Sequence, residues 1–246
     1  MGLRLLSQHS NQSSPRTFFA RLLAPIVLTI LGGISVFASA ENIKEQTTNT
    51  EVNSNRVITI GVLGDSLSAG FGLKPDETWV HHIENTFKGL AQFPKTRFIN
   101  ASVSGATTDA GIQMLPALLK QKPDIVILEL GANDGLQGKP LPLIYQNLTQ
   151  LITQIKATGA DILFLGIRLP PNLGKRYTEP FHAQFQSLAT SFELAYIPFF
   201  LEDVAGKQEF MQGDGLHPNA LAQPVIAERV LPELKGLVLK SIKQQK

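Results

Sequence analysis

The sequence predicts a three-layer α/β fold built on a parallel sheet. Five apolar runs, each bounded by turn residues, are too continuous for strands that face water on one side, and they suit strands buried on both faces. Segments with helical spacing of apolar residues lie between these runs, which is the pattern of βαβ units with right-handed crossovers. The chain has 246 residues, of which 43% are hydrophobic, enough to fill the core of one domain.

The expected strands are rich in β-branched and aromatic residues. They are "RVITIGVL" (56–63), "TRFINA" (96–101), "DIVILEL" (124–130), "DILFLGIRL" (161–169) and "ELAYIPFF" (193–200). Helices are expected in the gaps, over 77–90, 114–121, 142–159, 180–192 and 222–244. In the first of these helices, Trp79, Ile83 and Phe87 recur at the spacing of one helix face. The chain has no internal repeat and no change of composition along this part, so we expect one domain.

The first 40 residues have the features of a secretory signal peptide. Three arginines and no acidic residue accompany an apolar core, and Ala38-Ser39-Ala40 forms the small-residue pattern after which signal peptidases cut. An uncleaved anchor is the alternative, because residues 22–40 are nearly long enough to span a bilayer. We expect a signal peptide over 1–40, a flexible polar linker over 41–55, and a folded domain over 56–246.

Charge and cysteine content narrow the class of protein. The whole chain has a net charge of +2, but removal of residues 1–40 leaves 19 basic and 20 acidic residues and a net charge of −1. Nucleic acid is therefore not an expected partner, since its binding needs a basic patch on the folded domain. The chain has no cysteine, which excludes disulfides, cysteine-ligated zinc and a thiol nucleophile. We expect an exported protein, periplasmic or secreted, without stable membrane insertion after cleavage.

The segment "GDSLSAG" (64–70) follows the first expected strand, at the edge of a parallel sheet where ligands bind. A serine at position 66 would lie at a helix N-terminus, where free N–H groups favour a developing negative charge. The alternative is that Asp65 or Ser66 is only an N-cap. A phosphate loop is not indicated, because both glycine-rich phosphate motifs are absent here and no lysine or arginine lies between Ile58 and Gly72.

The loops after the second and third strands carry possible hydrogen-bond donors. Gly105 in "NASVSGATT" can bring a backbone N–H close to a ligand, although it could equally be an ordinary loop glycine. Asn133 in "GAND" has a side-chain amide at the carboxyl edge of the sheet, where it could be a turn former or an oxyanion donor.

Near the C-terminus, "QGDGLHPNA" places Asp214 and His217 three residues apart before a helix. At this spacing the carboxylate can reach the imidazole, set its tautomer and stabilise its charged form. A capped turn is the alternative for these residues taken alone. Together with Ser66 they supply the nucleophile, the base and the orienting carboxylate that serine hydrolysis needs.

Taken in order, "GDSLSAG", "SVSG", "GAND" and "DGLHPN" are similar to the four sequence blocks of the SGNH hydrolases, also called GDSL hydrolases. The resemblance covers residue 57 to about residue 235. It implies a three-layer α/β/α, flavodoxin-like fold whose five-stranded parallel sheet has the order 2-1-3-4-5. It also implies that residues 56–246 form an SGNH hydrolase domain.

The same resemblance implies a role for each matching residue. Ser66 would be the nucleophile, His217 the general base and acid, and Asp214 the orienting carboxylate. The oxyanion hole would consist of the backbone N–H of Ser66, the backbone N–H of Gly105 and the side chain of Asn133. The implied activity is a serine esterase or thioesterase acting on acyl esters, including aryl esters and acyl-CoA, with lysophospholipids as a further candidate.

Two other functions remain open from the residues alone. One is a carbohydrate acetylesterase of the same superfamily, and the other is a non-catalytic binding module, against which the intact residue set argues. The segment after the fourth strand favours an acyl substrate, since Ile167, Leu169 and Pro170 could form an apolar wall that buries an acyl chain. The alternative is that these side chains pack in the core.

No cofactor and no metal are expected. His81 and His82 are adjacent on a helical pattern and lack carboxylate partners at ligand spacing. The expected partner is a small-molecule acyl ester or thioester, and we expect the chain to act as a monomer.

Overall fold

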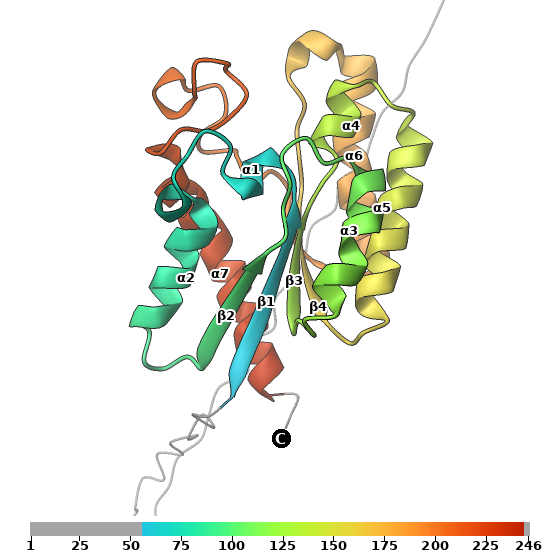
Figure 1. Ribbon diagram of the computed structural model, residues 1–246. Helices are drawn as coiled ribbons and strands as arrows, with labels where there is room; N and C mark the ends of the chain where they lie inside the picture. The colour runs from blue at the N-terminus through green and yellow to red at the C-terminus, as the bar shows by residue number, and fades with distance from the viewer. Residues whose placement is uncertain (1–55, 244–246) are drawn as a thin grey trace, which may run out of the picture. The chain divides into compact units, whose positions relative to one another are not determined.

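Five parallel strands form one sheet in the order β2-β1-β3-β4-β5, as expected. The computed structural model describes residues 56–243, which belong to one compact unit, so the expected signal peptide and linker lie outside the described residues. Figure 1 shows the sheet between two layers of helices. The strands are β1 (Val57–Gly64), β2 (Lys95–Asn100), β3 (Ile125–Glu129), β4 (Asp161–Leu165) and β5 (Ala195–Ile197).

Helices cover both faces of the sheet. The α-helices are α1 (Ser66–Ala69), α2 (Trp79–Gly89), α3 (Thr108–Leu119), α4 (Ala132–Leu136), α5 (Leu141–Lys156), α6 (Lys175–Ser191) and α7 (Ala222–Lys243). Three short 3-10 helices are η1 (Pro75–Glu77), η2 (Pro171–Leu173) and η3 (Gln208–Phe210). Helices α2 and α7 pack together on one face, while α3, α5 and α6 form the layer on the other (Figure 1). Among the described residues no helix is long and apolar enough to cross a membrane.

The fourth and fifth strands are shorter than expected: β4 ends at Leu165 rather than at residue 169, and β5 covers only Ala195–Ile197 of the expected 193–200. Gly166 lies so close to the chain after β5 that an added Cβ would come 2.1 Å from the Pro198 carbonyl oxygen. The Gly166 N–H donates to the Ile197 carbonyl, and the Gly166 carbonyl accepts from the Phe200 N–H, so the chain after β4 is joined here to the chain after β5. The sheet therefore stops where these two segments meet, and β5 is correspondingly short.

Two helices begin earlier than their apolar patterns indicate. Helix α3 begins at Thr108 because the side chain of Thr107 accepts a hydrogen bond from the backbone N–H of Ala110. Helix α6 begins at Lys175, so that Pro180 lies inside the helix instead of opening it. Both first turns are polar or exposed, and an apolar periodicity does not reveal them.

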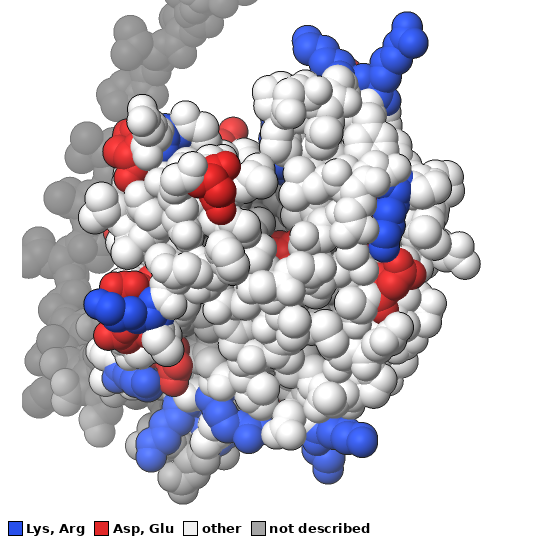
Figure 2. Space-filling model, turned by 45° about the horizontal axis from the view of Figure 1, so that its top comes forward, with Lys and Arg blue, Asp and Glu red and all other residues white. Residues whose placement is uncertain are grey.

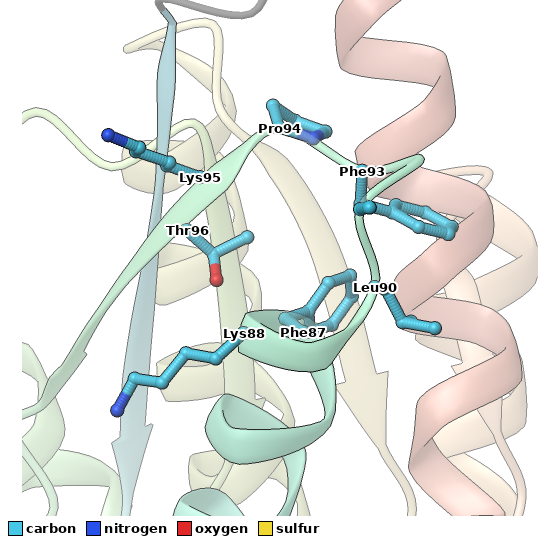
Figure 3. A pocket seen from close by; sticks show the side chains of 8 residues that line it. Phe87, Lys88, Leu90, Phe93, Pro94, Lys95 and Thr96 are labelled. Atoms are coloured by element: carbon cyan, nitrogen blue, oxygen red, sulfur yellow. The ribbon is translucent and has the colours of Figure 1, made fainter.

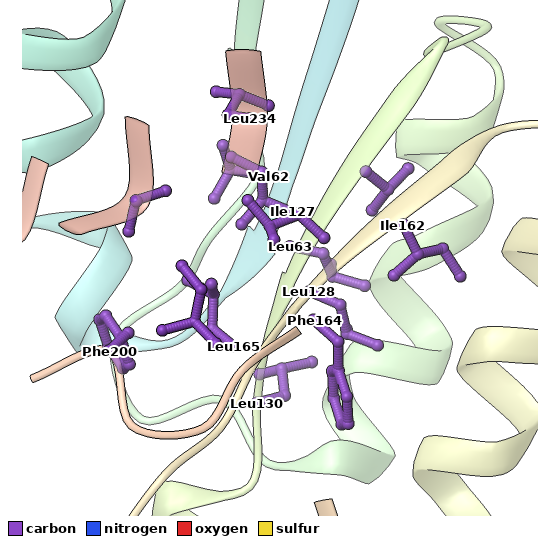
Figure 4. Packing of buried hydrophobic residues seen from close by; sticks show 14 of the residues in the cluster. Val62, Leu63, Ile127, Leu128, Leu130, Ile162, Phe164, Leu165, Phe200 and Leu234 are labelled. Carbon is purple, nitrogen blue, oxygen red and sulfur yellow. The ribbon is translucent and has the colours of Figure 1, made fainter. Parts of the chain in front are cut away.

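The core lies on both faces of the central strands. Figure 4 shows side chains from β1, β3 and β4 packed with residues from α7 and from the loop after β5. Gly61 permits a close approach here, since a Cβ at this position would lie 2.9 Å from Leu118 of α3. Each fully buried Leu, Ile or Phe side chain contributes about 1.5–3 kcal/mol to the free energy of folding. We call these packed central strands, β1, β3 and β4, the rigid frame.

This frame determines where the loops meet. Gly64 of β1 pairs with Glu129 of β3, so the residues that follow the two strands leave the sheet side by side. The loop after β2 reaches the same edge, where the backbone N–H of Val103 donates to the Gly64 carbonyl. Three of the sequence blocks singled out above therefore converge at the carboxyl edge of the sheet.

Candidate active site

Ser66 is the first residue of helix α1, immediately after the turn that leaves β1. Asp65 is the N-cap of this helix, and its Oδ1 accepts a hydrogen bond of 3.0 Å from the backbone N–H of Leu67. Gly70, with φ of 79°, ends the helix after one turn. We call residues 64–68 the nucleophile turn. The capping interpretation is correct for Asp65, and it places the Ser66 hydroxyl at a helix N-terminus.

His217 contacts both Ser66 and Asp214. The Ser66 hydroxyl donates to His217 Nε2 over 2.9 Å, and His217 Nδ1 donates to Asp214 Oδ2 over 2.6 Å. This direction follows because the carboxylate can only accept, which assigns the proton to Nδ1. Asp214 Oδ1 also accepts from the backbone N–H groups of Leu216 and His217. These contacts, that of the His217 backbone first, lower the Asp214 pKa from 3.8 to about 2.

The segment that carries Asp214 and His217 is a loop over residues 211–219, here called the catalytic loop. The backbone N–H of Gln212 donates to the His217 carbonyl, which closes the loop on itself. The Gln212 side chain donates 2.7 Å to the Phe71 carbonyl, just after helix α1. The Phe71 ring lies 4.5 Å from the His217 ring. Gln212 and Phe71 thus dock the loop beside the nucleophile turn.

Asn133 contacts Asp65, the neighbour of Ser66, and Gly105 lies in the loop whose Val103 N–H bonds to the Gly64 carbonyl. Asn133 is the second residue of α4, and its Nδ2 donates 3.1 Å to Asp65 Oδ2 and 3.0 Å to the Ala106 carbonyl. Gly105 has φ of 81°, a conformation that favours glycine. Among the described residues, no hydrogen-bond acceptor engages the backbone N–H of Ser66 or Gly105. Both hydrogen bonds that Asn133 Nδ2 can donate are already made, and its role as an oxyanion donor stays a prediction.

Two buried carboxyl groups beneath the site were not identified from the sequence. Glu129, the last residue of β3, is fully buried, and its Oε2 accepts from the Ser68 hydroxyl and the Asp65 backbone N–H. Asp134 is also fully buried; it accepts two hydrogen bonds from Thr108 and pairs with Lys139 at 3.3 Å. An acidic residue inside the apolar run "IVILEL" was the one available signal for Glu129.

Burial raises the pKa of two carboxyl groups close to Ser66, those of Asp65 and Glu129. The pKa of Asp65 rises from 3.8 to about 6, chiefly because its side chain is removed from water. Burial also holds the pKa of Glu129 well above its usual 4.5, and the charge of Asp65 raises it further. Asp65 within the nucleophile turn and Glu129 beneath it are therefore both shifted toward their neutral forms, while Asp214 is shifted toward its charged form.

The three residues expected to form an apolar wall are mostly packed inside. Ile167 and Leu169 are 3% and 8% exposed and belong to the core, while Pro170 is half-buried. Gly135 makes this packing possible, because a Cβ there would lie 2.6 Å from Leu169. Burial leaves these side chains little surface for a ligand, and their substrate role stays a prediction. Exposed apolar side chains in the segments that follow the strands include Phe71, Val103, Leu136, Leu173 and Leu216.

Figure 2 shows a hollow between two halves of the molecule, with acidic side chains in it and on the half at its left, while most lysines and arginines lie near the periphery of the view. A separate hollow of about 500 Å³ opens between the end of α2 and the start of β2 (Figure 3). Phe87 and Phe93 line it beside Lys88 and Lys95, at the amino edge of the sheet and away from Ser66.

Within the described part of the chain, no group of three His, Cys, Asp or Glu side chains could hold a metal ion.

The geometry matches one family of enzymes. The model of the GDSL-like lipase/acylhydrolase family matches residues 62–223, which include Ser66, Asp214 and His217 and the expected oxyanion donors. The chain belongs to this family. It is therefore an ester-hydrolysing enzyme, and its fold and sequence blocks are those expected from the resemblance.

Several relatives share most of their length with this GDSL hydrolase. It is 45% identical to the esterase TesA of Pseudomonas aeruginosa, over 73% of this chain and 89% of that protein. It is 43% identical to "Thioesterase 1/protease 1/lysophospholipase L1" of Escherichia coli, over 73% of this chain and 85% of that protein. The crystal structure of the esterase EstA from Pseudoalteromonas, inhibited by monoethylphosphonate, is 40% identical, with a TM-score of 0.68 and coverage of 72% and 97%.

Proposed function

We propose that this GDSL hydrolase cleaves acyl esters and thioesters through a covalent acyl-enzyme formed on Ser66. The observation that carries the proposal is the continuous hydrogen-bonded chain from Asp214 through His217 to the Ser66 hydroxyl, with distances of 2.6 and 2.9 Å. It supplies a weak nucleophile, a base within reach of its proton, and a carboxylate that orients the base.

The reaction proceeds in two steps at one carbonyl carbon. Ser66 Oγ attacks the substrate carbonyl while His217 Nε2 takes the hydroxyl proton, and the tetrahedral oxyanion faces the N–H groups of Ser66 and Gly105 and the Asn133 amide. His217 then gives its proton to the leaving alcohol or thiol as the carbonyl re-forms. In the second step His217 activates a water molecule, which releases the carboxylic acid and restores Ser66.

The substrate is a small-molecule ester, and we propose that its acyl chain lies against the exposed apolar side chains of the carboxyl edge. Each methylene removed from water contributes up to about 0.8 kcal/mol, or nearly fourfold in affinity. The value of kcat/KM should therefore rise from acetyl to octanoyl in a series of p-nitrophenyl esters and acyl-CoA thioesters. Because Leu169 is buried, the informative substitution is at the more exposed Leu173, and Leu173→Asp should flatten this rise.

The catalytic assignment is tested with a fluorophosphonate probe. The probe should label Ser66 in the wild-type enzyme and fail to label Ser66→Ala, while Ser68→Ala keeps a reactive serine at position 66. Labelling of Ser68 would contradict the assignment. A strong preference for acetylated sugars over octanoyl esters would instead favour the carbohydrate acetylesterase and leave the Ser66 assignment intact.

We further propose that residues 1–40 are a cleaved signal peptide, that 41–55 form a linker, and that the mature enzyme is a periplasmic or secreted monomer without a cofactor. Sequencing of the exported protein should then begin at Glu41. Retention of residues 1–40 in a membrane fraction would favour an anchor.

A further inference from the structure

Glu129 is a buried carboxyl group that the proposed mechanism does not use. Its side chain lies beneath the nucleophile turn, where Oε2 accepts a hydrogen bond of 2.7 Å from the Ser68 hydroxyl and one of 3.3 Å from the Asp65 backbone N–H. Asp65 precedes Ser66 by one residue and Ser68 follows it by two. One carboxyl oxygen therefore contacts the turn on both sides of Ser66.

The approach of this carboxyl group to the turn depends on Gly64. A Cβ at position 64 would lie 2.7 Å from Glu129 Oε2 and 2.8 Å from the Ser68 side chain, closer than side chains tolerate. On either side of Glu129 in the sequence, Leu128 and Leu130 are fully buried among the packed apolar residues (Figure 4). The carboxyl group is thus held in place by the rigid frame of the sheet.

The surroundings of Glu129 favour its neutral form. Within the described part of the chain no lysine, arginine or histidine pairs with it, and Oε1 has no hydrogen-bond partner. Asp134, by contrast, is equally buried but pairs with Lys139. An unpaired buried charge is far more unfavourable than an unpaired buried hydroxyl. Burial, together with the charge of Asp65, holds the Glu129 pKa well above its usual range, while Asp134 and His217 act on Asp65 in turn.

We propose that Glu129 is a positioning residue for the nucleophile. Its neutral carboxyl group accepts a hydrogen bond from each side of Ser66 and so holds the Ser66 hydroxyl in line with His217. A neutral group at this place also adds no second negative charge to that of Asp65 behind the site where the oxyanion forms. This inference rests on the proposed function, because it assumes that Ser66 is the nucleophile.

Two substitutions at position 129 separate the effect of the hydrogen bonds to the nucleophile turn from the effect of the carboxyl group's charge. Glu129→Gln keeps an acceptor oxygen for both donors and is neutral at every pH, whereas Glu129→Leu keeps the bulk and removes the acceptor. We expect Glu129→Leu to lower kcat by about 10²-fold, the effect of a small misplacement of a reacting group, with little change in KM. The conservative variant Glu129→Gln should keep most of the wild-type kcat.

The second readout is the rate at which a fluorophosphonate labels Ser66. Ser68→Ala removes one of the two contacts while changing little volume, and it should slow labelling by up to about tenfold, the equivalent of one hydrogen bond. Ser241→Ala is the matched control, because Ser241 is a buried serine of α7 at the amino edge of the sheet. It should label at the wild-type rate.

The third readout is the pH dependence of the melting temperature. An acid whose pKa is raised by folding destabilises the folded state as pH rises from its unfolded value. Glu129→Gln should therefore gain in melting temperature relative to wild type between pH 5 and pH 8. An unchanged difference in melting temperature over this range would show that the carboxylate is already charged in the folded enzyme and would overturn the neutral form.

The positioning role is overturned if Glu129→Leu and Ser68→Ala, folded and tested at equal concentration, both label at the wild-type rate. If Glu129→Leu fails to fold, Ser68→Ala with Ser241→Ala decides the question alone. Failure of the proposed function is distinguishable, since it would appear as full activity in Ser66→Ala, whereas the melting curves of the Glu129 variants do not depend on which serine reacts.

Discussion

The nucleophile turn and the catalytic loop meet at one hydrogen bond, yet they are built in different ways. Asp65, Ser68 and Glu129 are at most 1% exposed, and the contacts that hold Ser66 come from another strand and another helix. Asp214 is exposed, and its carboxylate is held by backbone groups two and three residues away. Ser66 is therefore positioned by the core, and His217 by a local turn.

This difference has a consequence for substitutions and for dynamics. A loop whose hydrogen bonds are local and exposed opens at a lower free energy than a strand end packed in the core. Changes in the catalytic loop should thus affect turnover much more than global stability. Changes beneath the nucleophile turn should affect both.

Ser66→Ala should produce the largest loss. Removing the nucleophile of a serine hydrolase lowers kcat by about four to six orders of magnitude, because the remaining groups only bind and polarise the substrate. The hydroxyl contributes little to packing, so the melting temperature should stay within one or two degrees of wild type. Hydrolysis of p-nitrophenyl butyrate and a thermal melt measure the two effects, and full activity of the variant would exclude Ser66.

Asp214→Asn should lower kcat by about 10³- to 10⁴-fold, since the amide can donate to His217 Nδ1 and stabilise the wrong tautomer. Oδ1 still accepts from the backbone of the catalytic loop, so the fold should be unaffected. Steady-state kinetics beside circular dichroism measure this separation. A large drop in melting temperature with retained turnover would mean that the loop supports the fold rather than the chemistry.

Asn133→Ala should lower kcat by about 10²- to 10³-fold with a smaller change in KM, as expected for a donor that acts on the transition state. Unlike Asp214→Asn, it should also lower the melting temperature, because Asp65 Oδ2 and the Ala106 carbonyl each lose a donor. Lost stability with unchanged kcat would identify Asn133 as a turn residue only.

Gln212→Ala should have a smaller effect, about tenfold on kcat, because it removes the bond from the catalytic loop to the Phe71 carbonyl but leaves the Asp214–His217 contact in place. The melting temperature should not change. Faster hydrogen exchange confined to residues 211–219 would confirm local loosening, and unchanged kcat would show that the loop needs no docking contact.

The smallest expected effect concerns stability: the contributions of Asp65 and Asp214 to it should change with pH in opposite directions. The pKa of Asp65 is raised from 3.8 to about 6, so its contribution to stability is complete below pH 3.8 and falls as pH rises through 6. The pKa of Asp214 is lowered to about 2, so its contribution is present above pH 3.8 and is lost as pH falls through 2. Melting temperatures of Asp65→Asn and Asp214→Asn against wild type from pH 2 to 7 should show these opposite trends, and parallel curves would contradict the burial of Asp65.

Much of the site could be predicted because its parts are local. A cap and a helix start follow from "GDS", and three residues of spacing suffice to bring a carboxylate to an imidazole, so Asp214 and His217 meet as expected. The order of the strands followed from the resemblance to SGNH hydrolases and is confirmed. The oxyanion roles of Gly105 and Asn133 and the substrate role of Leu169 stay predictions.

The sequence by itself determined the elements and the residue types of the chemistry, because periodicity, caps and short spacings act within a few residues. Only the tertiary structure decided what each side chain faces. Ser66 and His217 are 151 positions apart, and Asp65 and Asn133 are 68 apart, so their contacts depend on how the sheet aligns its loops. The burial of Leu169 and the neutral environment of Glu129 have the same origin, since exposure and pKa depend on neighbours that the chain brings from far along its length.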